Sequence, residues 1–215
     1  TARIAILPVP YDRTSTWKKG ADRGPAAIIE ASHQVEWYDI QTGTEVCRHG
    51  IKTEEAVTCE EGPEVLADLV DERVTGILKG GVLPVVIGGD HSVAIGAIRA
   101  AARFQGGASV LQIDAHADTR EVYQGSPFNH ACVMARARQW CDVVQVGIRA
   151  VDASEMPALQ ADRVFWAHDI AAAPDSAWMD DAVAALQGPV WVTIDVDGFD
   201  PSVLPATGTP EPGGL

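Results

Sequence analysis

The chain has 215 residues, 47% of them hydrophobic and 21% charged, and it carries a net charge of −14. This length and apolar content fit one globular domain over residues 1–215, and the acidic balance without a basic run argues against nucleic acid as a partner. No apolar run is long enough to span a membrane and no signal peptide is evident, so we expect no membrane partner. The four cysteines lack C-x-x-C spacing, which favours reduced thiols in a cytoplasmic protein.

The hydrophobic periodicity predicts strands and helices that alternate along the chain. Strands are expected over 4–9, 83–87, 109–113, 143–146, 164–166 and 190–194, and helices over 26–33, 63–79, 92–104, 131–138, 153–160 and 176–187. Residues 39–61 are expected to be irregular. Because the strands are continuously apolar and alternate with helices, the pattern predicts a parallel sheet covered by helices on both faces.

Both ends of the chain look cut. The sequence begins at Thr1 without a Met and stops at Leu215 in a turn-rich segment. We therefore expect further structure to follow in the native protein.

Three of the predicted strands run directly into residues that bind metals. The strand at 109–113 leads into Asp114, His116 and Asp118, whose side chains alternate onto one face. His91 follows the strand at 83–87, and Asp195 and Asp197 follow the strand at 190–194. In open parallel sheets, ligands bind outside the carboxyl ends of the strands, so all three motifs are expected at one site.

Six such groups, four of them carboxylates, suit two divalent cations better than one. Crowded carboxylates repel one another unless a cation neutralises them. Oxygen-rich ligation with some imidazole and no nearby thiol favours Mn²⁺ over a thiolate-preferring metal. Paired ions about 3.5–4 Å apart generate a nucleophile from water at neutral pH, so the pattern predicts hydrolysis of a poor electrophile.

Each motif alone has a simpler interpretation, and these alternatives are weaker when all three motifs occur together. Asp195 and Asp197 could belong to a solvated loop, and His91 could be a core histidine. Asp90 could cap the helix that begins near Ser92.

Two further residues are candidates for substrate chemistry. Glu211 lies between two prolines, so its loop can be neither helix nor strand, and a rigidly held carboxylate fits a guanidinium bidentately. His130 follows the Asp118 motif and could carry a proton to a leaving amine. A solvated turn glutamate and a surface histidine are the alternatives.

The motifs together resemble the ureohydrolase (arginase/agmatinase) family. The resemblance rests on Gly88-Gly89-Asp90-His91-Ser92, Asp114-Ala115-His116-Ala117-Asp118, Asp195-Val196-Asp197-Gly198-Phe199-Asp200-Pro201 and Gly208-Thr209-Pro210-Glu211-Pro212-Gly213-Gly214. Pro10-Tyr11-Asp12 and Gly24-Pro25-Ala26 extend it, and Tyr123-Gln124-Gly125 with Asn129-His130-Ala131-Cys132 is most similar to the agmatinase branch.

The resemblance implies a three-layer α/β/α fold and two Mn²⁺ ions. It implies that His91, Asp114, Asp118 and Asp195 hold one ion, and that His116, Asp114, Asp195 and Asp197 hold the other. Asp118 would also orient the attacking nucleophile, His130 would shuttle the proton, and Glu211 would bind the guanidinium. Family chains usually continue beyond the Glu211 loop, so the C-terminal part is expected to be missing here.

The sequence thus predicts hydrolysis of a small cationic guanidino compound to an amine and urea, with agmatine, which yields putrescine, as the leading substrate. Guanidinobutyrate, arginine and guanidine remain alternatives, because Arg120 could meet a substrate carboxylate or pair with Glu121. A catalytically silent homologue acting as a binding subunit is a different possibility. A two-metal phosphoesterase is another, although it would need Lys or Arg around the site. We expect a cytoplasmic homo-oligomer.

Overall fold

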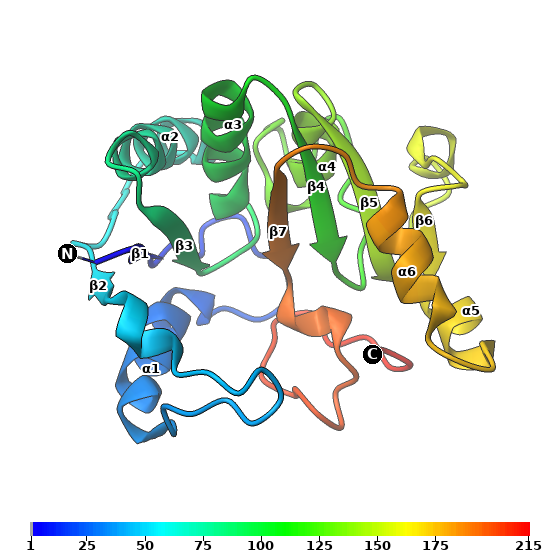
Figure 1. The fold of residues 1–215 in the computed structure, drawn as a ribbon. Helices are drawn as coiled ribbons and strands as arrows, with labels where there is room; N and C mark the ends of the chain where they lie inside the picture. The colour runs from blue at the N-terminus through cyan, green and yellow to red at the C-terminus, as the bar shows by residue number, and fades with distance from the viewer. Residues whose placement is uncertain (1) are drawn as a thin grey trace.

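The computed structural model describes residues 2–215, so Thr1 lies outside the described part of the chain. Its strands are β1 (Ile4–Val9), β2 (Ile51–Thr53), β3 (Leu83–Gly88), β4 (Ala108–Ile113), β5 (Cys141–Ile148), β6 (Val164–Trp166) and β7 (Val190–Ile194). Every strand pairing is parallel, and the spatial orders are β2-β1-β3 and β6-β5-β4-β7. The predicted parallel arrangement is therefore confirmed (Figure 1).

The helices cover both faces of the strands. They are α1 (Gly24–Ala31), α2 (Pro63–Lys79), α3 (Val93–Gln105), α4 (Val133–Ala137), α5 (Ala167–Ala172) and α6 (Ala177–Ala184). Ile95 of α3 and Val133 of α4 pack with Val143 on one face of β5, and Ala182 of α6 packs with Val144 on the other face. The predicted three-layer α/β/α architecture is thus confirmed.

The hydrogen-bonded ladders form two groups rather than one continuous sheet. Strand β3 is an edge strand of the first group and β7 is an edge strand of the second. Among the described residues, no hydrogen-bonded ladder joins these two strands. Helix α3 packs against both strands, and the carboxyl ends of β3, β7 and β4 point toward the same central region (Figure 1). The residues that follow these three strands therefore meet there.

Three local predictions were wrong. The segment 39–61 contains β2, whose three exposed residues leave no periodic signal although they pair with β1. The helix expected over 153–160 is only a single 3-10 turn, Met156–Ala158, because Pro157 disfavours a longer helix. Helix α5 was not predicted because its six residues are too short for a helical pattern.

Within residues 2–215, no helix has the length and apolarity needed to cross a bilayer. All four cysteines are free thiols in the structure, and Cys132 and Cys141 are buried.

Candidate metal centre and active site

The strand ends bring the predicted metal-binding residues together. Asp114 directly follows β4. Two residues later, His116 forms an isolated parallel β-bridge with Ala150, which lies just after the end of β5. Asp118 has a φ of +52°, a left-handed conformation that non-glycine residues rarely adopt. Its carbonyl accepts hydrogen bonds from the first turn of α4, which holds this strained conformation in place.

The first cluster of donors consists of His91, Asp114 and Asp118. The Nδ1 atom of His91 lies 2.8 Å from Asp118 Oδ2 and 3.2 Å from Asp114 Oδ2. Asp195 Oδ2 lies 3.9 Å from the same nitrogen. The other ring nitrogen, Nε2, is 2.9 Å from the Thr193 hydroxyl on β7, which orients the imidazole.

The second cluster consists of Asp114, His116 and Asp197. His116 Nδ1 lies 3.1 Å from Asp197 Oδ2 and 3.7 Å from Asp114 Oδ1. Asp114 therefore offers one oxygen to each cluster. This is the arrangement expected of a carboxylate shared between two cations.

The crowded charges perturb the acid–base chemistry of the site. Burial, reinforced by Asp114 and Asp197, raises the pKa of Asp195 to about 8. Burial and the charge of Asp114 likewise raise the pKa of Asp118 to about 6. Burial opposes protonation of His116, but hydrogen bonds to Asp114 and Asp197 raise its pKa to about 11. Without cations, protons on these groups offset the carboxylate charge.

The donor set fits divalent cations of intermediate hardness. In each cluster the donor atoms lie within 4.8 Å of one another, and they are carboxylate oxygens and imidazole nitrogens. Among the described residues, neither cluster includes a cysteine. Such a set matches Mn²⁺ better than a thiolate-preferring metal.

Cation binding is expected to release protons. Mn²⁺ needs the deprotonated forms, whereas at pH 7 His116 and Asp195 hold protons because their pKa values are raised to about 11 and about 8. Raising the pH from 6 to 8 should therefore increase the apparent affinity of the metal-free protein for Mn²⁺. Calorimetry in buffers of different protonation enthalpy measures the protons released. An affinity independent of pH, with no proton release, would contradict this prediction.

Glu211 lies beside the second cluster. Its Oε1 atom is 3.8 Å from His116 Nε2, and its side chain is 41% exposed. Arg149 holds the loop by donating to the carbonyls of Glu211 and Asp197, each at 2.6 Å, and Thr209 donates to Asp197 Oδ2 at 2.9 Å. The loop therefore presents a partly accessible carboxylate next to the donor clusters.

His130 is connected to the strand ends through Thr14, which sequence reasoning missed. The Thr14 hydroxyl accepts from the His130 backbone N–H at 3.1 Å and lies 3.1 Å from His130 Nδ1. Asp90 accepts from the Thr14 amide at 2.9 Å. Burial lowers the pKa of His130, which favours the neutral form of the imidazole. These contacts leave Nε2 as the nitrogen that can face a substrate.

Asp90 stabilises the start of helix α3, the structural role that the sequence also allowed. Its Oδ1 atom accepts from the amide of Ser92, the residue that precedes α3, and its Oδ2 atom holds Thr14. Gly89 passes so close to Tyr11 that a Cβ atom would lie 1.9 Å from the Tyr11 carbonyl oxygen. Close backbone packing thus places His91 beside the other ligands.

Arg120 contacts two acidic residues, neither of which is its neighbour Glu121. Its Nε atom lies 3.4 Å from Glu155 and its Nη2 atom 3.6 Å from Asp152, and its guanidinium stacks 4.9 Å above the Tyr123 ring. Glu121 instead pairs with Arg136, so the pairing of Arg120 with Glu121, one of the two alternatives that the sequence left open, is not formed. The acidic partners lie after β5 and could not be found from local spacing.

The sequence profile described as "Arginase family" matches residues 2–215. The chain belongs to the arginase family. It is 39% identical to N(1)-aminopropylagmatine ureohydrolase of Synechocystis sp., with all of this chain and 73% of that protein aligned. The enzyme of the same name from Thermus thermophilus is 37% identical, with 100% and 74% aligned.

A solved structure gives the same assignment. The agmatine ureohydrolase of Thermoplasma volcanium superposes with a TM-score of 0.90 at 29% identity, and the match covers 100% of this chain and 73% of that one. The chain is therefore an agmatinase-like ureohydrolase, a hydrolase acting on C–N bonds of linear amidines.

Proposed function

We propose that this arginase-family chain uses two Mn²⁺ ions to hydrolyse a small cationic guanidino compound to an amine and urea, with agmatine, which gives putrescine, as the leading substrate. The observation that supports this most is the pair of donor clusters sharing Asp114, with the Glu211 carboxylate 3.8 Å from His116. Two divalent cations would then lie next to the Glu211 carboxylate, which would bind the guanidinium of the substrate.

Six residues are proposed to hold the ions. His91, Asp114, Asp118 and Asp195 would hold one, and His116, Asp114, Asp195 and Asp197 the other. When bound, such ions supply a nucleophile from water at neutral pH.

The remaining residues bind the substrate and move its proton. Glu211 would accept two hydrogen bonds from the guanidinium and turn its carbon toward the donor clusters. Water adds to that carbon, the bond to the substituted nitrogen breaks, and a proton must reach this nitrogen as it leaves. His130, held by Thr14 and with a pKa lowered by burial, would accept at Nε2 a proton released by the added water and pass it to this nitrogen.

The charges around the site favour substrates without a carboxylate. Arg120 is neutralised by Asp152 and Glu155, so it is not free to bind the carboxylate of arginine or guanidinobutyrate. The net charge of −14 also favours a polycation. N(1)-aminopropylagmatine is a second candidate, because the relatives from Synechocystis and Thermus carry that name.

A substrate panel tests the proposal. We expect the Mn²⁺-loaded protein to release urea from agmatine or aminopropylagmatine with a kcat/KM at least tenfold above that for arginine and guanidinobutyrate. Comparing the two polyamines decides between the two candidates. Preference for a carboxylate-bearing substrate would contradict the assignment of Arg120.

His130→Asn is expected to lower kcat by about 10²-fold, since proton transfer by a positioned side chain typically contributes at least this much. Its metal content should be unchanged because His130 belongs to neither cluster. His168→Asn, which changes an exposed histidine on α5, is the matched control. A variant with the parent's kcat would remove His130 from the mechanism.

The other possibilities have less support. A phosphoesterase would need cationic side chains to hold phosphate. The Arg149 guanidinium, beside the Glu211 loop, instead donates its hydrogen bonds to backbone carbonyls. A silent homologue is disfavoured because all six ligand residues are present. A cytoplasmic location and a homo-oligomeric state are further parts of the proposal.

A further inference from the structure

Two glutamines lie at the centre of the buried sheet without any exposure. Gln112 of β4 and Gln145 of β5 are both 0% exposed and face each other as register partners in the parallel ladder. The corresponding pair two residues earlier, Val110 and Val143, is apolar. Burying an amide is unfavourable unless its hydrogen-bonding groups are satisfied, so this polar pair needs a physical explanation.

The two amides form a continuous chain of hydrogen bonds that ends at Asp114. Arg138, which follows α4, donates from Nη2 to Gln145 Oε1 at 2.9 Å. Gln145 Nε2 donates to Gln112 Oε1 at 2.7 Å, and Gln112 Nε2 donates to Asp114 Oδ2 at 2.8 Å. The second N–H of each amide donates to a backbone carbonyl, that of Ala117 for Gln145 and that of His116 for Gln112.

The direction of this chain is determined by its two ends. A guanidinium can only donate hydrogen bonds and an ionised carboxylate can only accept them. Rotating either amide by 180° would therefore place two donors or two acceptors against each other at both of its contacts. Gln112 can present only its N–H group to Asp114, and Gln145 keeps it in that orientation.

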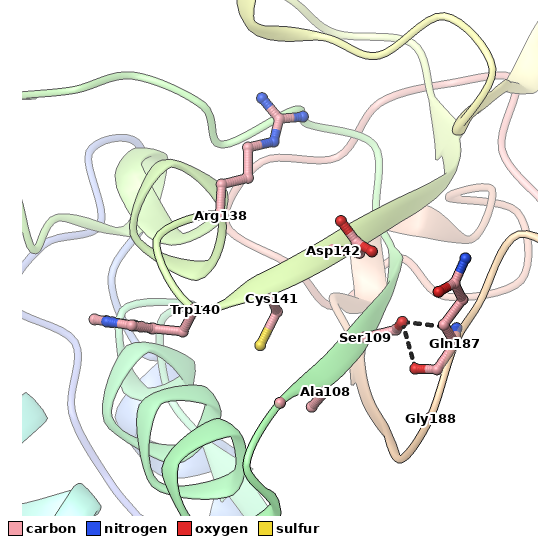
Figure 2. A pocket seen from close by; sticks show the side chains of 9 residues that line it. Ala108, Ser109, Arg138, Trp140, Cys141, Asp142, Gln187 and Gly188 are labelled. Atoms are coloured by element: carbon pink, nitrogen blue, oxygen red, sulfur yellow. Dashed lines mark hydrogen bonds between the residues drawn. The ribbon is translucent and has the colours of Figure 1, made fainter.

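The chain of hydrogen bonds crosses from Arg138 through β5 and β4 to the proposed metal centre. Arg138 is one of the residues around a pocket at the amino ends of β4 and β5, and Figure 2 shows its guanidinium extending away from Ser109 and Asp142. Asp114 lies at the carboxyl end of β4 and is shared by both donor clusters. Its Oδ1 atom accepts from the His116 amide at 2.7 Å, so one hydrogen bond holds each carboxylate oxygen.

We propose that Gln112, oriented by Gln145 and Arg138, is a positioning residue that sets the Asp114 carboxylate for cation binding. The proposal rests on the metal centre of the proposed function. Each Asp114 oxygen keeps a free lone pair directed at its own cluster, because the hydrogen bonds restrict rotation of the carboxylate. The Asp114 carboxylate is then already ordered by folding, so cation binding does not have to supply the free energy of ordering it.

The test compares Mn²⁺ affinity and thermal stability in three variants of the full chain. Gln112→Met replaces the amide with an apolar side chain of similar length, and we expect the dissociation constant of the tighter ion to rise by about 10–100-fold. Gln145→Met leaves the Gln112 donor in place but removes its orienting partner, so a smaller increase is expected. Val143→Ala, on the same face of β5, is the control that lowers stability without touching the chain of hydrogen bonds.

The outcomes separate positioning from simple packing. The proposal is supported if both glutamine variants weaken Mn²⁺ binding while Val143→Ala retains the parent's affinity at a reduced melting temperature. It is overturned if the glutamine variants bind Mn²⁺ like the parent, or if Val143→Ala weakens binding as much as Gln145→Met. If the parent itself binds no Mn²⁺, the metal centre of the proposed function fails, and this inference fails with it.

Discussion

Asp114→Asn is expected to lose at least one Mn²⁺ ion per chain and to lower urea release by about 10³-fold. Asp114 offers one oxygen to each donor cluster, so removing its charge weakens both ion sites at once. Divalent ions contribute several kcal/mol to stabilising the transition state, and about 1.4 kcal/mol corresponds to a tenfold change in rate. Metal analysis of the purified variant, together with a urea assay, measures both effects.

Asp142→Asn is the matched control for this variant. Asp142 lies on β5 with a half-exposed side chain. It lines the pocket at the amino ends of β4 and β5, whereas Asp114 follows the carboxyl end of β4 (Figure 2). It should retain two ions and the parent's activity. Full two-ion occupancy in Asp114→Asn would show that this carboxylate is not shared between the ions.

Glu211→Gln is expected to lower kcat/KM by about 10²-fold or more while both Mn²⁺ ions remain bound. A charge-assisted hydrogen bond to the guanidinium contributes about 1.5–3 kcal/mol, and the bidentate pair also orients the carbon for attack. The substitution keeps the size of the side chain and removes its charge. Because the carboxylate positions as well as binds the substrate, kcat should fall together with affinity.

The control for Glu211→Gln is Glu60→Gln, which alters a glutamate on the molecular surface with a side chain that is 97% exposed. It should behave like the parent. If Glu211→Gln hydrolyses agmatine and its relatives as well as the parent does, the guanidinium anchor is wrong and the phosphoesterase alternative becomes stronger.

The sequence was sufficient to predict that the acidic and histidine side chains after the apolar strands lie close together. Asp114, His116 and Asp118 follow an apolar strand with alternating spacing, and parallel strands bring their carboxyl ends to one edge. The helices and the parallel pairing followed from the same alternation of apolar segments. Elements with three exposed residues, such as β2, carry too little pattern to be found in this way.

The residues that support the site were not predictable, because their partners are distant in sequence. Thr14 contacts His130 across 116 positions, and Gln145 contacts Gln112 across 33. A threonine in a loop or a glutamine in a strand has no local signature of such a role. Only the packed sheet shows that Gln112 and Gln145 are fully buried and joined to Asp114.

The most direct test of the central claim is to titrate metal-free protein with Mn²⁺ and to follow urea release from agmatine and its aminopropyl derivative against the number of ions bound. We predict that activity appears as occupancy approaches two ions per chain and that urea and the product amine form in equal amounts. Two bound ions without urea release from either compound, or full activity in the metal-free protein, would contradict the account.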